Sequence, residues 1–101
     1  MKIAVTYQDG DIFQHFGHTE FFKIYDIENT DIVKTEIVST NGSGHGALAQ
    51  FLHEHSVDTL ICGGIGGGAQ MALSQAGIKL YGGVTGKADD AVNALLNNKL
   101  N

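Results

Sequence analysis

The spacing of apolar residues changes period partway along this 101-residue chain, and that change limits the folds open to it. Residues 2–7 alternate between apolar and polar side chains, and residues 21–27 and 32–38 are two more β-rich segments. Alternation with a period of two indicates strands that bury one face. Residues 28–31, which separate the second and third segments, are typical of a hairpin turn. The first 40 residues therefore predict three strands.

The second half of the chain has helical spacing instead. Three stripes of apolar residues recur at i, i+3, i+4 and i+7, over residues 48–55, 69–76 and 88–95, and each predicts an amphipathic helix. Short apolar runs at residues 57–62 and 78–81 lie between these stripes and predict two buried strands. The second half is thus expected to alternate between helix and strand.

The expected order is βββ-α-β-α-β-α, an α/β fold in a single domain over residues 1–101. Antiparallel strands followed by right-handed βα units are best accommodated by a mixed sheet with helices on its faces. An apolar content of 43% with 17% charged residues is globular and excludes a disordered tail.

Charge and cysteine content narrow the classes of partner. Six lysines, no arginine and eleven acidic residues give a net charge of −5, which disfavours a nucleic-acid partner because arginine is a main reader of guanine and phosphate. No apolar run approaches the roughly 20 residues that span a bilayer, and the N-terminus does not resemble a signal peptide. The single Cys62 excludes an intramolecular disulfide. We therefore expect a cytoplasmic protein without a membrane partner.

Glycines cluster at two places, each between a predicted strand and a predicted helix. Residues 62–69 read Cys-Gly-Gly-Ile-Gly-Gly-Gly-Ala, and residues 82–86 form a similar second cluster. Such a loop lets N–H groups at a helix start bind an anion, or serves only as a tight strand-to-helix crossing, and the sequence leaves both open. A dinucleotide or P-loop site is disfavoured, because the expected acid and the Gly-Lys-Ser/Thr motif are missing. The candidate anion-binding glycines are Gly63, Gly64, Gly66, Gly67, Gly68 and Gly83.

Histidines and the cysteine are the candidate metal ligands. His15 and His18 lie in the loop after the first strand, where two imidazoles could face one ion, and His45 lies near a predicted helix start. If the first strand is parallel to the two later ones, its loop opens on the same sheet edge as the glycine clusters. Cys62 is either a small core residue or a thiolate whose pKa is lowered by the following helix start.

Catalytic arrangements are sparse. Asp9 and Asp11 are paired carboxylates, but they flank Gly10 in a segment that is typical of a turn. A Cys62 pair with His15 or His45 lacks a third group to orient the histidine, and no Gly-x-Ser-x-Gly motif occurs. We therefore do not expect an enzyme.

The ordered combination of motifs resembles the dinitrogenase iron-molybdenum cofactor biosynthesis family over nearly the whole chain. The residues that carry the resemblance are the opening strand, Gln-His-Phe-Gly at 14–17, the segment 21–26, Gly-Gly-Ile-Gly at 63–66, Ala-Gly-Ile at 76–78, Tyr-Gly-Gly at 81–83 and Gly86. The resemblance implies a ribonuclease H-like α/β fold with a mixed five-stranded sheet. It also implies a carrier or chaperone of metal–sulfur clusters rather than an enzyme, with His15 as a cluster ligand.

The leading hypothesis is a non-catalytic carrier of an anionic iron–sulfur or molybdenum-containing cluster during metallocofactor assembly or trafficking. The cluster would be cargo received from a donor protein and passed to an acceptor protein. His15 would be the principal ligand, His18, His45 and Cys62 would be helpers, and backbone N–H groups of the glycine cluster would stabilise the sulfides.

Three alternatives remain open. The same glycine-rich edge could bind a small anionic, phosphate-bearing metabolite. A thiol- or metal-dependent hydrolase would need Cys62 or a bound metal. An adaptor for other proteins would be indicated by an exposed apolar patch around Phe13 and Phe16.

Overall fold

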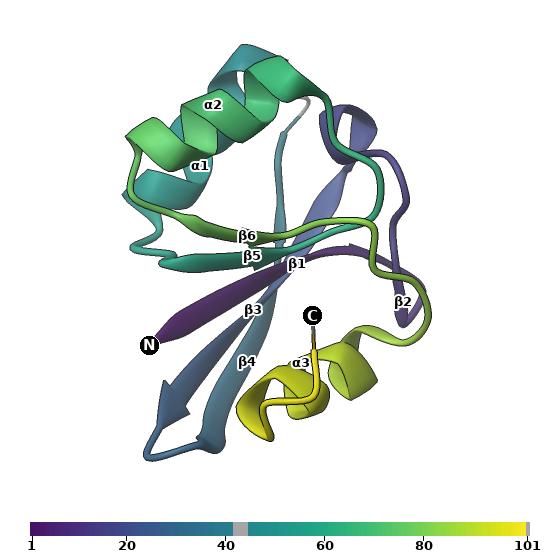
Figure 1. The fold of residues 1–101 in the computed structure, drawn as a ribbon, viewed down its shortest axis with the longest axis vertical. Helices are drawn as coiled ribbons and strands as arrows, with labels where there is room; N and C mark the ends of the chain where they lie inside the picture. The colour runs from purple at the N-terminus through teal and green to yellow at the C-terminus, as the bar shows by residue number, and fades with distance from the viewer. Residues whose placement is uncertain (42–44, 101) are drawn as a thin grey trace.

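A computed structural model describes residues 1–41 and 45–100, and of residues 45 and 46 it describes the backbone alone. Figure 1 shows the elements in their spatial arrangement. Their order and bounds are β1 (Lys2–Gln8), β2 (Asp11–Ile12), the 3₁₀ helix η1 (Phe16–His18), β3 (Phe21–Glu28), β4 (Asp31–Ser39), α1 (His45–Glu54), β5 (Thr59–Ile61), α2 (Gly67–Gln75), β6 (Lys79–Tyr81) and α3 (Ala88–Leu96).

The strands form one mixed sheet with β1 at its centre. The order across the sheet is β4-β3-β1-β5-β6, and β2 pairs with the end of β1. β1, β5 and β6 are parallel, whereas β3 is antiparallel to both of its neighbours. The predicted α/β fold, with strands first and helix–strand units after them, is therefore confirmed.

The two-residue strand β2 is an addition to the five strands that the sequence predicts. The segment after the first strand was expected to be a loop with a turn around Gly10, and Asp9 and Gly10 do turn the chain back, with φ angles of 52° and 91°. This turn pairs Gln8 with Asp11 and Tyr7 with Ile12. A segment of two residues is too short to show any alternation, so the hydrophobic pattern could not predict it.

Helices cover both faces of the sheet. In Figure 1, α1 and α2 lie together on one face, and α3 lies on the other. A buried cluster that includes Phe22, Leu48 and Leu60 fills the space under α1 and α2, and a second cluster that includes Ile3 and Val92 lies under α3. In the described part of the chain, none of these helices has the length and apolar character that a membrane crossing requires.

The predicted hairpin turn connects β3 to β4. Glu28 pairs with Asp31, and the two residues between them, Asn29 and Thr30, have φ angles of 51° and 70°. Two consecutive positive φ angles are the geometry whose twist matches that of the flanking strands. Thr30 is branched at Cβ, so it occupies this left-handed conformation under strain.

Candidate functional site

Three loops meet where the parallel strands β1, β5 and β6 end. Because parallel strands finish at the same edge of a sheet, residues 9–20, 62–66 and 82–87 are adjacent (Figure 1). The expectation that the first strand shares this edge with the glycine loops is confirmed. Backbone hydrogen bonds join each pair of loops, among them Gly64 N–H to Gln14 O (2.7 Å), Gly83 N–H to Gly63 O (2.8 Å) and Ile12 N–H to Gly86 O (2.9 Å).

Gln14 connects all three loops. Its carbonyl accepts the N–H of Gly64, and its side-chain amide donates to the carbonyl of Ile12 at 3.0 Å and to that of Val84 at 3.1 Å. The next residue, His15, forms an isolated parallel β-bridge with Gly64, in which Phe16 N–H donates to Gly64 O at 3.0 Å. These bonds fix the position of the His15 segment relative to the glycine loop.

Gly63 is required by this packing. A Cβ atom at Gly63 would lie 2.6 Å from the Cα of Gln14, which is closer than such atoms approach one another in proteins. Gly64 is also tight, since its Cβ would lie 3.1 Å from the Gln14 carbonyl oxygen. Gly83 has a φ of +70°, which favours glycine. The N–H groups of Gly64 and Gly83 are both used within the protein, so these glycines have a structural role.

The other three glycines of the loop have open surroundings. Cβ atoms at Gly66, Gly67 and Gly68 would contact nothing within 4 Å. Gly66 is the N-cap of α2, and as a glycine it has no side chain to cap the first turn. The first N–H groups of a helix have no acceptor within the helix and carry its positive dipole. Residues 66–68 therefore present an exposed N-terminal helix end to an anion.

His15 is joined to the glycine loop through its backbone and lines a shallow hollow. Its backbone forms the isolated bridge with Gly64, and its exposed imidazole packs edge-on against Phe13, with ring centroids 6.0 Å apart. The hollow, of about 390 Å³, is also lined by Asp9 and Asp11. These carboxylates disfavour an anion in the hollow, so an anionic ligand of His15 is better placed on the side of the glycine loop.

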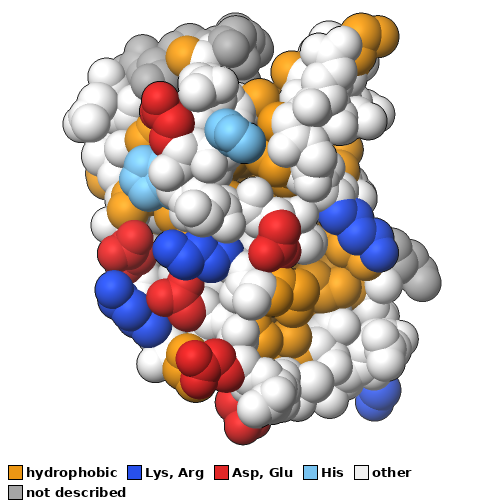
Figure 2. Space-filling model, turned by 90° about the vertical axis from the view of Figure 1, so that its left-hand side faces the viewer, with side chains coloured by type: hydrophobic (Ala, Val, Ile, Leu, Met, Phe, Trp, Pro, Cys, Tyr) orange, Lys and Arg blue, Asp and Glu red, His pale blue; other side chains and the backbone are white. Residues whose placement is uncertain are grey.

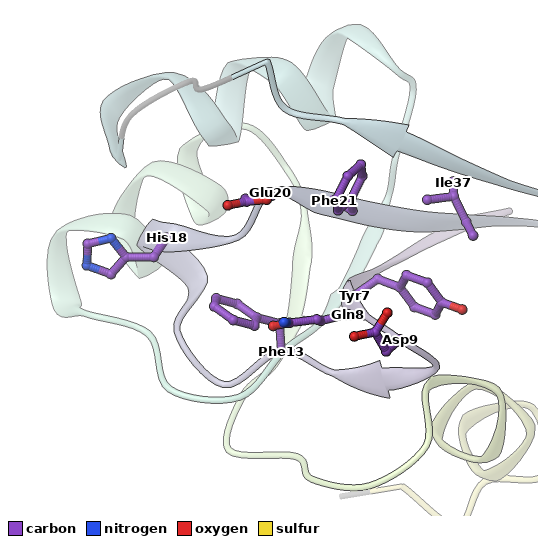
Figure 3. Close-up of a pocket in the computed structure, with 8 residues that line it drawn as sticks. All are labelled: Tyr7, Gln8, Asp9, Phe13, His18, Glu20, Phe21 and Ile37. Carbon is purple, nitrogen blue, oxygen red and sulfur yellow. The ribbon is translucent and has the colours of Figure 1, made fainter.

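His18 lines a different and larger cavity. A pocket of about 520 Å³ lies between the ends of β1 and β3 and the loop that follows β2. Figure 3 shows Phe13 and Phe21 on its opposite sides, with His18 at one end and Tyr7 and Asp9 at the other. Glu20 and Ile37 complete the lining with Gln8.

Cys62 belongs to the core. It is fully buried in the cluster beneath α1 and α2, and burial raises the pKa of its thiol to about 12. The expectation that the helix start would lower this pKa is wrong, because loss of hydration opposes the thiolate more strongly. Of the two roles that the sequence left open for Cys62, the structure favours the core residue.

The remaining predicted residues fall into three groups. His45 begins α1, but its side chain lies outside the described residues. Phe16 is 2% exposed and belongs to the core, so it cannot contribute to the surface patch that an adaptor would need. Asp9 forms the turn before β2, and Asp11 pairs with Lys87 at 3.0 Å.

No group of three or more His, Cys, Asp or Glu side chains that could hold a metal ion occurs in the described ranges.

Lysines supply little concentrated positive charge. On the face drawn in Figure 2, lysine and acidic side chains lie beside one another instead of forming a basic patch. Three lysines are paired with acids, namely Lys2 with Asp26 at 3.8 Å, Lys23 with Asp89 at 2.9 Å and Lys87 with Asp11 at 3.0 Å. An anion at this edge would therefore depend on backbone N–H groups more than on side-chain cations.

Gln14 is the residue that the sequence did not single out as functional. Its partner Val84 is 70 residues away, so no local spacing could indicate that contact. The sequence feature that could have pointed to Gln14 is its position directly before the His-Phe-Gly motif. Gln14 acts on the site by fixing the position of its neighbour His15.

Comparison with known proteins gives a consistent result over the whole chain. Residues 1–98 match the family model described as dinitrogenase iron-molybdenum cofactor. An uncharacterized protein of Methanocaldococcus jannaschii, MJ0580, is 31% identical over 105 residues, covering 99% of this chain and 89% of that protein.

Two solved structures have the same fold. The crystal structure of PH0822 superposes with a TM-score of 0.94 at 30% identity, covering 100% of this chain and 93% of the other. The apo form of the orange protein from Desulfovibrio gigas superposes with a TM-score of 0.86 at 27% identity, covering 99% and 90%. The His-Phe-Gly loop lies against the glycine loop in this fold, and the matches cover the whole chain. The chain therefore belongs to the dinitrogenase iron-molybdenum cofactor family.

Proposed function

We propose that this protein is a non-catalytic carrier of an anionic metal–sulfur cluster, iron–sulfur or molybdenum-containing, during metallocofactor assembly or trafficking. The cluster is cargo, received from a donor protein and released to an acceptor. The observation that carries the proposal is the backbone bridge between His15 and Gly64, which holds an exposed imidazole beside the glycine loop that begins α2.

The chemistry of the two groups is complementary to such a cargo. A neutral imidazole is a ligand for iron and related transition metals. The N–H groups at the start of α2 can donate to the negative sulfides, and the helix dipole adds to this attraction. Both groups act on one ligand, because Gln14 fixes the loops that carry them.

The donor set suits a carried cluster better than a resident metal ion. A structural metal site has about four protein ligands, and the described residues contain no group of three. Cys62, which would be the natural sulfur ligand, is buried and protonated. A ligand held through one imidazole and several backbone donors remains exposed on one side, where an acceptor protein can take it.

The test is reconstitution without oxygen. The protein is supplied with ferrous iron and sulfide, with and without molybdate, and desalted, and the metal that remains bound is measured by mass spectrometry. We expect His15→Ala to lose most of the bound metal, whereas His53→Ala, which alters an exposed histidine of α1, retains it. Equal retention of metal by the two variants would show that His15 is not a ligand of the cluster.

The helix start is tested by a second variant. Gly68→Asp puts a carboxylate among the first N–H groups of α2, where an acid stabilises the helix but repels an anion. We expect it to reduce metal retention without lowering the thermal midpoint. The family association with iron-molybdenum cofactor supports the cluster as ligand, while stabilisation by phosphate-bearing metabolites alone would favour the binding of a metabolite instead.

A further inference from the structure

Apolar side chains are exposed along one margin of the sheet. Of the six large hydrophobic residues that are exposed in the described part of the chain, four lie on β3 or β4. These are Phe21 (41% exposed), Ile32 (37%), Val33 (53%) and Ile37 (54%). Such a concentration is unusual for a free surface and marks a surface that another molecule covers.

The margin itself is the strand β4. It is the last strand in the sheet order, so its outer edge has no strand beside it among the described residues (Figure 1). Asp31–Ser39 is also long for an edge strand, with nine residues against three in β6 at the opposite margin. An edge of unpaired N–H and C=O groups with apolar side chains is a template for pairing with another strand.

We propose that β4 pairs with β4 of a second copy of this chain, antiparallel about a two-fold axis at Thr35. Thr35 is the central residue of the nine, and this register pairs residues 33–37 of the two strands, of which 34–37 lie on the regular side of the shift between Asp26 and Ile27. Val33 then lies opposite the partner's Ile37, and apolar residues cover one another. The inference is independent of the proposed cluster site, since β4 contains none of its ligands.

Charge determines the register. With Thr35 on the axis, Lys34 faces the partner's Glu36, and symmetry produces this opposite-charge pair twice. Opposite residues in an antiparallel pair must present the same face, so the smallest shifts of the register move the axis to Lys34 or to Glu36. Either shift would set two like charges directly opposite each other, which destabilises the pairing.

Two features of β4 are consistent with one specific partner. Lysine on an edge strand ordinarily prevents indiscriminate pairing, but in this register Lys34 meets a carboxylate. The pairing with β3 shifts between Asp26 and Ile27, which leaves Val33 as an extra residue of β4 without a partner on β3. The most regular part of the dimer is therefore the charged centre, which discriminates a second copy from an unrelated strand.

Charge reversal tests both the partner and the register. Sedimentation equilibrium is measured from micromolar to millimolar concentration for the wild type, Lys34→Glu, Glu36→Lys and an equimolar mixture of the two variants. We expect the wild type to dimerise and each single variant to dimerise at least about tenfold more weakly, because two attractive pairs become repulsive. The mixture should form a heterodimer, since the two acidic side chains of one variant strand then face the two lysines of the other.

Lys99→Glu and Glu54→Lys are the matched controls, because they make the same charge changes at exposed positions away from β4. Both should dimerise like the wild type. A wild type that remains monomeric at all concentrations would overturn the proposal. So would single variants that dimerise as well as the wild type, or a mixture that does not associate. Circular dichroism of each variant verifies that the fold is unchanged.

Discussion

Replacing Gly63 with alanine should destabilise the fold through Gln14. The added methyl group would lie 2.6 Å from the Gln14 Cα and 2.7 Å from its side-chain Cδ and Oε1. Because a backbone atom is the nearest neighbour, rotation of the Gln14 side chain cannot remove the clash. The segment that carries His15 must move away from the glycine loop.

The size of the effect follows from what Gln14 would lose. Overpacking a close contact costs about 1–3 kcal/mol, and each intramolecular hydrogen bond contributes about 1 kcal/mol net. Gln14 makes two side-chain bonds, to Ile12 and Val84, and accepts a third from Gly64. Partial loss of these bonds together with the overpacking should lower the free energy of unfolding by about 2–4 kcal/mol.

Urea unfolding followed by circular dichroism measures this difference, and a thermal scan adds a shift of about 4–8 °C for each kcal/mol. Gly68→Ala is the matched control. It makes the same change in open space within the first turn of α2, and it should stabilise the protein by about 0.5–1 kcal/mol. A Gly63→Ala variant within about 0.5 kcal/mol of the wild type would refute the packing argument.

Individual residues give three further predictions. Cys62 should resist thiol reagents at neutral pH until urea unfolds the chain, because burial raises its pKa to about 12; rapid modification of the folded protein would contradict this. Hydrogen bonds from Tyr25 (2.6 Å) and Lys23 (2.9 Å) lower the pKa of Asp89. This stabilisation is present above the unfolded-state pKa and is lost as the pH falls through the lower folded-state pKa, so Asp89→Asn should lose less stability on acidification than the wild type in urea titrations. Thr30→Gly should raise the free energy of unfolding by about 0.5–1 kcal/mol, because it relieves a strained φ of 70°; an unchanged or lower value in urea unfolding would count against strain.

Most of the fold was predictable because it depends on periodic burial. The alternation in residues 2–7 and the helical stripe in residues 48–55 correspond to β1 and α1. The meeting of three loops at one edge then follows from the parallel strands, without any knowledge of side chains. The pattern could not predict β2, which is produced by the backbone conformations of Asp9 and Gly10.

The site was less predictable because it depends on contacts between distant residues. The sequence indicated the glycine loop as one unit, whereas the structure divides it into Gly63 and Gly64, which pack against Gln14, and residues 66–68, which are open. The sequence left open whether Cys62 is a core residue or a thiolate of lowered pKa, because the degree of burial cannot be read from a single residue at a strand end. The exposure of each residue and its long-range hydrogen bonds decide these roles, and both are seen only in the structure.

The central claim is that His15 and the start of α2 together bind an anionic metal sulfide. NMR of the histidine imidazoles tests it most directly, with ¹⁵N-histidine-labelled protein titrated with tetrathiomolybdate or with phosphate at equal concentration. We predict that the His15 nitrogen signals shift to saturation with tetrathiomolybdate but not with phosphate, while those of His53 do not move. Binding of tetrathiomolybdate that leaves the His15 signals unchanged, or an equal response to phosphate, would contradict the account.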